Sequence, residues 1–212
     1  MGMRDAMGPT GMGTKSKGMQ ACGALLLAGL LLAGCSVGRI NSRDFVQPGA
    51  ALPAGATVAV LPFENLTNHP NAGQIAADLV STELYGVGNV RTVEAGRVRS
   101  RLAAQKSSDA ATAPEAPADA PLDAQAAGRA LAVDAVLAGS VSEYGYQHGL
   151  REEPVVGLNA RLVRVSDGAV LWTSSQSEAG RGYFSRDSVN NVAQRVVTRM
   201  IDSLRPAVAA TP

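Results

Sequence analysis

The chain has 212 residues, of which 46% are hydrophobic and 17% are charged, and its 19 basic and 18 acidic residues nearly cancel. A near-neutral chain gives no electrostatic argument for binding nucleic acid or an anionic lipid surface. The length suits one ordinary domain with a tether and is too short for two domains.

The first feature along the chain is a secretory signal. Lys15 and Lys17 precede an apolar run from Ala21 to Leu32, and small residues follow it. This order of cationic start, short apolar core and small residues is typical of a signal peptide, and the run is too short for a membrane-spanning helix. We therefore expect residues 1–34 to be removed and the chain to leave the cytoplasm.

The end of this signal, Leu32-Ala33-Gly34-Cys35, resembles the lipobox of bacterial lipoproteins. The resemblance implies that Cys35 becomes the acylated first residue, palmitate included, and that Cys22 leaves with the signal. Each buried methylene adds about 0.8 kcal/mol, so two or more acyl chains would make a stable anchor. In these lipoproteins Asp after the cysteine retains the protein at the inner membrane; Ser36 here implies the outer membrane. The alternative is ordinary secretion, with Cys35 a free thiol.

The mature chain would begin with a tether. Removal of the signal leaves 16 basic and 17 acidic residues, a net charge of −1, and one cysteine, so no disulfide forms. Residues 36–56 are polar and broken by Pro48, Gly49, Pro53 and Gly55. We therefore expect residues 35–56 to be a lipidated tether and order to begin at Thr57.

The first half of the domain alternates strands with helices. An apolar, β-branched run over residues 57–63 predicts a buried strand. The apolar stripe over residues 72–84 predicts a helix, residues 90–93 a second strand, and residues 95–105 a basic amphipathic helix. Residues 107–121 are rich in Ala and Pro without an apolar period, which predicts a disordered surface loop; a partner-binding arm is the alternative.

The second half reads as a short helix over residues 122–132 and three strands. The strands are expected at residues 134–147, 155–165 and 169–177. The phase of apolar residues slips at Val163, which predicts either a bulge or a stretch buried on both faces, and Ser166-Asp167-Gly168 predicts a tight hairpin turn. Trp172, within the last strand, is expected in the core.

A final helix is expected to follow. Its broad apolar face includes Val192, Val196 and Met200, with Ser185 as the expected cap and Pro206 as the expected end. The whole predicts one α/β domain over residues 57–206 with a short tail at 207–212. Its mixed sheet would start with βαβ crossovers, end in an antiparallel meander, and be covered by helices on at least one face.

No grouping of residues in the sequence indicates catalysis. His69 and His148 are isolated, and neither has a spacing suited to a metal or to a Ser or Cys nucleophile. Glu152 and Glu153, before Pro154, are more typical of a solvated loop corner than of a general acid and base. We therefore expect a noncatalytic protein without a cofactor or a metal.

Three segments carry a resemblance to a known family over residues 57–204. They are Ala59-Val60-Leu61-Pro62-Phe63 with Asn65 and Thr67, Ala138-Gly139-Ser140-Val141, and the hairpin from Leu162 to Trp172. The chain resembles a periplasmic α/β domain, similar to the TolB N-terminal or anticodon-binding-like fold, that several outer-membrane lipoproteins share. They include the PelC type of Pel exopolysaccharide export, the curli secretion channel CsgG, and LpoB, an activator of a peptidoglycan synthase.

Size separates these types. The curli channel adds membrane-inserting hairpins, and no second pair of long alternating strands is visible here to line a pore. LpoB has a long Pro-rich arm, whereas the tether expected here has about twenty residues. The PelC type, with a short tether and one domain, is the most similar, and the stretch from Gly149 to Gly157 also resembles it.

The resemblance implies a ring of identical subunits beneath the outer membrane. The ring would guide a cationic polysaccharide, part of a biofilm matrix, into an outer-membrane β-barrel partner. Alternatives are a peptidoglycan-synthase activator, a curli-type secretion accessory, or a generic envelope lipoprotein with a TolB-like domain.

The resemblance also implies candidate sites. An exposed aromatic before the last helix contacts lipid in that family, and Tyr183 and Phe184 lie at that position; packing against the helix is the alternative. Acids line the ring opening, for which solvated surface acids are the alternative here. The candidates are Asp134, Glu143, Glu152 and Glu153.

Overall fold

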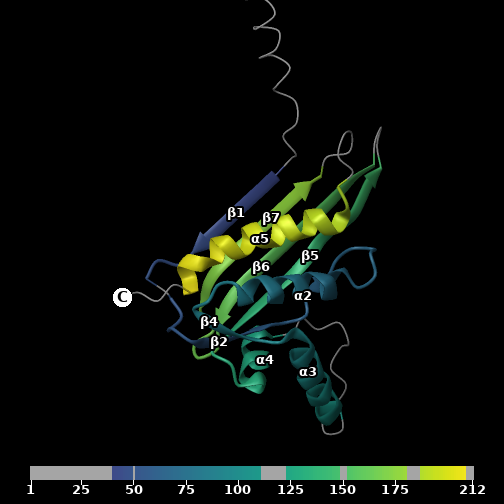
Figure 1. Cartoon of the computed structure of the whole chain (residues 1–212). Coiled ribbons are helices and arrows are strands. Elements are labelled where there is room, and N and C mark those ends of the chain that lie inside the picture. Colours follow the sequence, from purple (N-terminus) through teal and green to yellow (C-terminus); the bar gives the residue numbers. More distant parts are fainter. Residues whose placement is uncertain (1–39, 50, 111–122, 149–151, 181–186, 209–212) are drawn as a thin grey trace, which may run out of the picture. The chain divides into compact units, whose positions relative to one another are not determined.

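A computed structural model describes residues 40–49, 51–110, 123–148, 152–180 and 187–208, without the side chains of residues 108–110 and 148. The described residues form one seven-stranded mixed sheet with helices on both faces (Figure 1). The strands are β1 (Ile40–Val46), β2 (Ala56–Val60), β3 (Glu64–Asn65), β4 (Val90–Val93), β5 (Ala135–His148), β6 (Glu152–Arg164) and β7 (Val170–Ala179). The helices are α2 (Ala72–Tyr85), α3 (Ala95–Ala110), α4 (Ala124–Leu131) and α5 (Val189–Val208).

The strand order, β1-β7-β6-β5-β2-β4, confirms the predicted fold class. β2 lies between β4 and β5 and is parallel to both, as βαβ crossovers require. β5, β6 and β7 then form an antiparallel meander. The expected first strand is shorter than residues 57–63, because β2 ends at Val60 and the two-residue β3 makes its own pairing with β5.

The predicted hairpin between β6 and β7 is confirmed. Gly168 has φ of 75°, a left-handed conformation that glycine adopts without steric cost, and its N–H donates to the Arg164 carbonyl at 2.9 Å. The phase slip that predicted a bulge corresponds to a shift in register between Leu162 and Val163. A second shift, between Val141 and Glu143 of β5, was not predicted.

The start of β6 corrects one prediction. Glu152 and Glu153 were expected in a loop, but they lie in the strand, where they pair with His148 and Gln147 of β5. Pro154 does not prevent this pairing. It lies near the end of the hairpin, where its missing N–H removes at most one hydrogen bond of the ladder.

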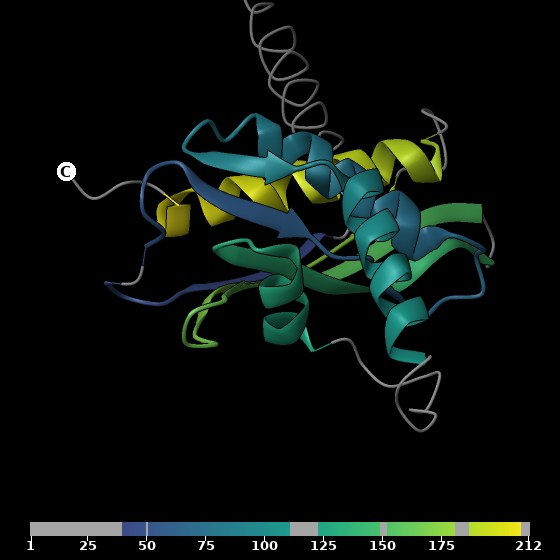
Figure 2. The same ribbon diagram turned by 90° about the horizontal axis from the view of Figure 1, so that it is seen from below.

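Two apolar cores flank the sheet. α2 and α5 cover one face, where their apolar stripes pack against β2, β5, β6 and β7, and Trp172 is fully buried there as predicted. α3 and α4 cover the other face over β2, the first part of β5 and the end of β6 (Figure 2). α3 continues to Ala110, into the segment expected to be a disordered loop; the rest of that segment lies outside the described residues.

The last helix does not end at Pro206 as predicted. Pro206 lies inside the last turn, where its missing N–H removes only one helical hydrogen bond, and α5 continues to Val208. The Leu52 N–H donates to the Ala207 carbonyl at 3.1 Å, so a carbonyl of the last turn is satisfied by the segment between β1 and β2. Ser185, the expected cap, lies outside the described residues.

β1 overturns the expectation that residues 35–56 form a continuous tether. Ile40–Val46 pairs antiparallel with β7 along its whole length, from Ile40 opposite Glu178 to Val46 opposite Trp172. Leu52, farther along the same segment, is buried in the core beneath α5. The pattern of apolar residues did not reveal β1, because six of its seven residues are exposed.

Candidate functional site

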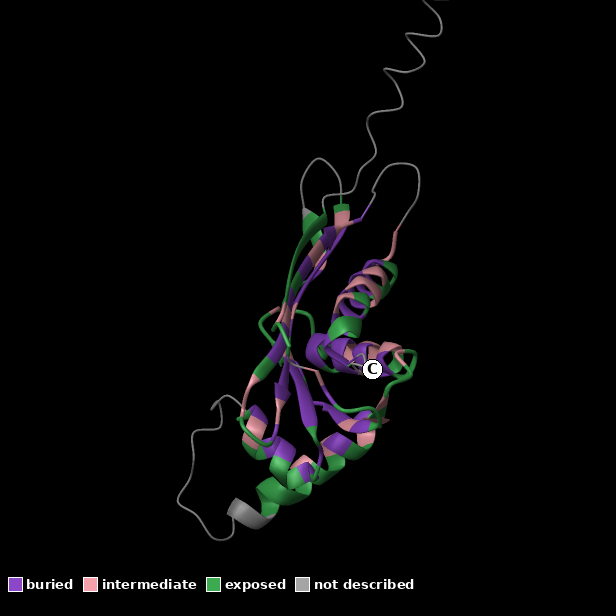
Figure 3. Cartoon of the chain, turned by 90° about the vertical axis from the view of Figure 1, so that its left-hand side faces the viewer, coloured by how far each residue is buried: buried purple, intermediate pink, exposed green. Residues whose placement is uncertain are grey.

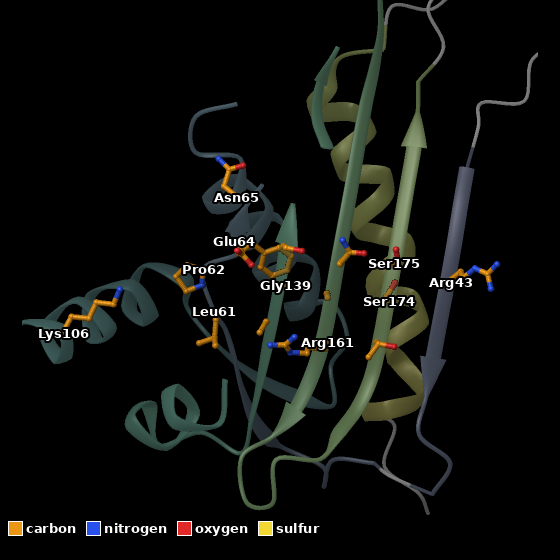
Figure 4. A pocket seen from close by; sticks show the side chains of 16 residues that line it. Arg43, Leu61, Pro62, Glu64, Asn65, Lys106, Gly139, Arg161, Ser174 and Ser175 are labelled. Carbon is orange, nitrogen blue, oxygen red and sulfur yellow. The ribbon is translucent and has the colours of Figure 1, made fainter. Parts of the chain in front are cut away.

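One half of the sheet has a face that no described helix covers. α5 packs on one face of β6, β7 and β1, while α3 and α4 lie at the lower end of the sheet and leave the upper part of the other face bare (Figure 3). This surface, which we call the open face, borders a hollow of about 780 Å³. Its floor comes from β5, β6, β7 and β1, and its wall from α3 and residues 61–65 (Figure 4).

The register of the four strands places small polar side chains in rows on the open face. Successive strands contribute Ser140, Asn159, Ser175 and Arg43 to one row. A second row consists of Ala138, Arg161, Thr173 and Phe45, and a third of Glu143, Gly157, Ser177 and Asn41. The alternation of side chains along each strand explains why these residues face away from α5.

The hollow carries more positive than negative charge. Arg43 of β1, Arg161 of β6 and Lys106 of α3 line it, against one carboxylate, Glu64 (Figure 4). Among the described residues, neither Arg43 nor Arg161 has an ion-pair or hydrogen-bond partner, and both are exposed. The open face therefore offers unpaired guanidinium groups, hydroxyls and an amide to hydrogen-bond acceptors.

The His, Cys, Asp and Glu residues in the described part of the chain form no candidate metal site, since no three or more of them are grouped to hold a metal ion. The ring of His69 packs against that of Tyr144, with centroids 4.9 Å apart, away from the hollow. The Tyr144 hydroxyl donates to Asn190 Oδ1 at 2.8 Å, and burial raises the pKa of Tyr144 above its usual value.

On the opposite side of β1 and β7, a polar cluster joins these strands to α5. Asp44 of β1 accepts hydrogen bonds from Ser174 Oγ at 2.5 Å, Gln176 Nε2 at 3.0 Å and Ser203 Oγ at 3.0 Å. Ser203, on α5, also accepts the indole N–H of Trp172 at 3.1 Å. We call these residues the Asp44 cluster.

Burial and hydrogen bonding have opposite effects on the pKa of Asp44. Burial raises the pKa of its carboxyl, whereas hydrogen bonds from Ser174, Ser42, Ser203 and Gln176 lower it, and the net effect holds the pKa below its ordinary value. The Asp44 cluster therefore favours an ionised carboxylate.

A second polar group lies where β7 meets the start of α5. Glu178 is 6% exposed and pairs with Arg195 at 2.7 Å and with Arg199 at 2.7 Å. Arg195 also contacts Asp187 at 3.1 Å. The burial of Glu178 is thus compensated by two cations, which fix this part of β7 to α5.

The structure separates one of the four acidic candidates from the others. Asp134 lies at the start of β5, where its Oδ2 accepts the Thr57 N–H at 2.7 Å. Glu152 and Glu153 lie at the far end of the β5–β6 hairpin, and Glu143 lies between, on the open face. At about 3.3 Å per residue, Asp134 is roughly 45 Å from the hairpin end.

Three other sequence-predicted residues, Cys35, Tyr183 and Phe184, lie outside the described residues. Sequence reasoning missed Arg43 and Asp44 because it placed them in the tether. Their only signal is the adjacent Phe45-Val46, since residues 41–44 are all polar. No helix in the described ranges is both long and apolar enough to cross a membrane.

Comparison with known proteins finds similar solved structures but no match among family models or curated sequences. Among solved structures, a PelC dodecamer from Paraburkholderia phytofirmans is 27% identical, with a TM-score of 0.56, over 82% of this chain and 100% of that one. Lipoprotein GNA1162 from Neisseria meningitidis is 21% identical, with a TM-score of 0.50, over 69% of this chain and 99% of that one.

The C-terminal domain of LpoB from Salmonella enterica is also similar, at 18% identity and a TM-score of 0.41, over 61% of this chain and 86% of that one. The predicted resemblance to PelC-type lipoproteins is confirmed, since the PelC subunit is matched over its whole length. The GNA1162 match shows the fold.

Proposed function

We propose that this chain is a noncatalytic outer-membrane lipoprotein that assembles as a periplasmic ring and assists export of a Pel-like exopolysaccharide through a β-barrel partner. The observation that carries the proposal is the match to the PelC dodecamer, which spans that whole subunit at 27% identity. The lipobox ending at Cys35 supports the lipid anchor, and Ser36 supports sorting to the outer membrane.

In this proposal the open face contacts the next copy of the chain. A ring needs a heterologous interface, in which one surface of each subunit meets a different surface of its neighbour. The open face offers Arg43 and Arg161 without partners among the described residues, and the mature chain has one more acid than base to provide complementary carboxylates. A second copy would also cover the sheet face that the described helices leave bare.

Two groups of residues would face the other partners. Glu152 and Glu153 lie toward one end of the sheet, and we assign them to the opening that admits a cationic polysaccharide, whereas Glu143 lies on the open face that the next copy would cover. Asp134 has a structural contact with Thr57, so its role in the opening is the weaker assignment. Tyr183 and Phe184 would contact lipid.

The mass of the native assembly tests the ring. Light scattering would be measured on the chain that starts at Ser36 and on the acylated chain in detergent, over a range of concentrations. A discrete multi-subunit species supports the proposal, and Arg43→Glu with Arg161→Glu should reduce it to monomer. The matched control, Arg97→Glu with Arg205→Glu, makes the same charge change on exposed helix residues away from the hollow.

A monomer in both preparations would contradict the ring and favour the synthase-activator alternative.

The lipid-contact assignment has its own test. Tyr183→Ala with Phe184→Ala should reduce polysaccharide export in cells while the circular dichroism of the purified domain stays unchanged. Normal export by this variant would remove the assignment.

A further inference from the structure

Two cations extend toward each other across the hollow. Arg161 lies on β6 and Lys106 on α3, and their side chains point into the space between these elements, on either side of Leu61 (Figure 4). Both are exposed, and within the described ranges neither has a hydrogen bond or an ion pair. Like charges repel each other, and an anion between the two side chains would turn this repulsion into attraction.

Neutral hydrogen-bond donors lie beside the two cations. Ser140 of β5 and Asn159 of β6 are directly opposite each other, and Arg161 follows two residues farther along β6 on the same face. These three side chains therefore lie within about 7 Å of one another along the strands. A guanidinium, a hydroxyl and an amide can together donate to several oxygens of one ligand.

The one carboxylate that lines the hollow leaves its charge positive. Glu64 lies on β3 opposite Ser140 and makes no ion pair with Arg161 or Lys106. With Arg43 on β1, three cations line the hollow against this one acid. A hollow of about 780 Å³ with this charge disfavours a metal ion or a cationic sugar and suits a phosphate or carboxylate group.

We propose that Arg161 and Lys106 bind a free oxyanion, either phosphate or a small carboxylate, which neutralises the hollow before the next copy covers it. This inference rests on the proposed ring. A guanidinium can bind such a group through two parallel hydrogen bonds, and the Lys ammonium adds a second positive charge from the opposite wall.

The carboxylates of the next copy explain why a free anion is needed. Covering an unpaired guanidinium is costly, so each cation in the contact needs a counter-charge. Several described carboxylates already have partners within their own chain, and Glu152 and Glu153 are assigned to the opening. The carboxylates with such partners are Asp44, Asp78, Asp134, Asp167, Glu178 and Asp202. A small oxyanion supplies the missing negative charge.

Binding is tested with inorganic phosphate and the acylated full chain in detergent. The phosphorus NMR line of phosphate, recorded in chloride at constant ionic strength, should broaden on binding, and sodium acetate should reverse the broadening by competition. Arg161→Gln with Lys106→Gln should lower the affinity about tenfold, because charge-assisted hydrogen bonds are lost. The matched control, Arg97→Gln with Arg205→Gln, removes two exposed cations that do not line the hollow and should leave the affinity unchanged. Equal affinities in the two double variants would overturn the site.

Light scattering identifies the source of the anion. In phosphate, assembly should begin at a protein concentration about tenfold lower than in chloride of the same ionic strength. The variant with Arg161→Gln and Lys106→Gln should assemble alike in both salts. If phosphate dissociates the assembly, a carboxylate of the next copy holds these cations and the inference is wrong. Equal assembly of the unmodified chain in both salts would overturn it as well. A chain that binds phosphate but stays a monomer in both salts refutes the proposed ring and not the anion site.

Discussion

β2 and β1 belong to the same sheet but are held in it by different interactions. β2 is nearly all buried, between two parallel neighbours and two apolar cores. β1 is nearly all exposed, and a hydrogen-bonded ladder with β7 and the Asp44 cluster hold it. The difference teaches that an edge strand can be fixed by backbone pairing and one well-bonded carboxylate, without a buried apolar face.

The largest loss of stability is expected at Trp172, where the apolar core meets the Asp44 cluster. Trp172 pairs with Val46 of β1, is fully buried in the apolar core, and donates to Ser203 of the Asp44 cluster. Trp172→Ala should lower the free energy of unfolding by about 3–5 kcal/mol, because it leaves a large cavity. Urea denaturation measures this loss.

Phe45→Ala is its control within β1. Phe45 is 55% exposed on the open face, so the free energy of unfolding should change by less than about 0.5 kcal/mol. Similar losses for both variants would show that β1 depends on apolar burial after all.

A smaller and more local effect is expected at Asp44. Asp44→Ala removes the acceptor for Ser174 and Gln176, which are 4% and 2% exposed, and should cost about 1–3 kcal/mol. Hydrogen exchange should accelerate at the amides that β1 and β7 share and stay slow in β2. Arg43→Ala, whose side chain lies on the opposite face of β1, should change neither; uniform acceleration in β2 would contradict the comparison.

Tyr144 tests a second polar contact between the sheet and α5, at a residue that is buried in the apolar core. Its hydroxyl donates to Asn190 of α5, so Tyr144→Phe should lower the free energy of unfolding by about 0.5–1.5 kcal/mol. Asn190→Ala in the same background should add little, because the two residues share one bond. Additive losses measured by denaturation would mean that the pair does not interact.

The smallest effect is a pH dependence confined to β1. The pKa of Asp44 is lowered in the folded protein, so its stabilisation is complete above the ordinary carboxyl value near 3.8 and is lost as the pH falls through the folded value. Exchange of the β1–β7 amides, corrected for intrinsic rates, should therefore accelerate below about pH 4. In Asp44→Asn this step should be missing; its persistence would assign it to another group.

The sequence predicted the elements whose signal is local. Apolar runs and stripes predicted β2 and α5, and Asp167-Gly168 predicted the β6–β7 turn, because burial and turn geometry depend on adjacent residues. β1 was not predicted, since its pairing with β7 joins residues more than 120 positions apart and its side chains carry no apolar pattern.

The candidate site depends even more on distant pairing. The polar alternation around Asn159 and Arg161 was visible in the sequence, but the row that joins Asn159 to Ser175 and Arg43 is set by the register of three strands. The acidic candidates could be named from the sequence, whereas the separation of Asp134 from Glu152 required the length of β5.

The antiparallel pairing of β1 has a mechanical consequence. An acyl anchor would pull on β1 from Ile40, along the strand axis, while the rest of the domain is held back through β7 and α5. Ladder hydrogen bonds run perpendicular to the strands, so such a force loads all the bonds between Ile40 and Val46 together instead of opening them one by one. The geometry is one of shear, and a strand with little apolar burial gains mechanical resistance from the direction in which it is pulled.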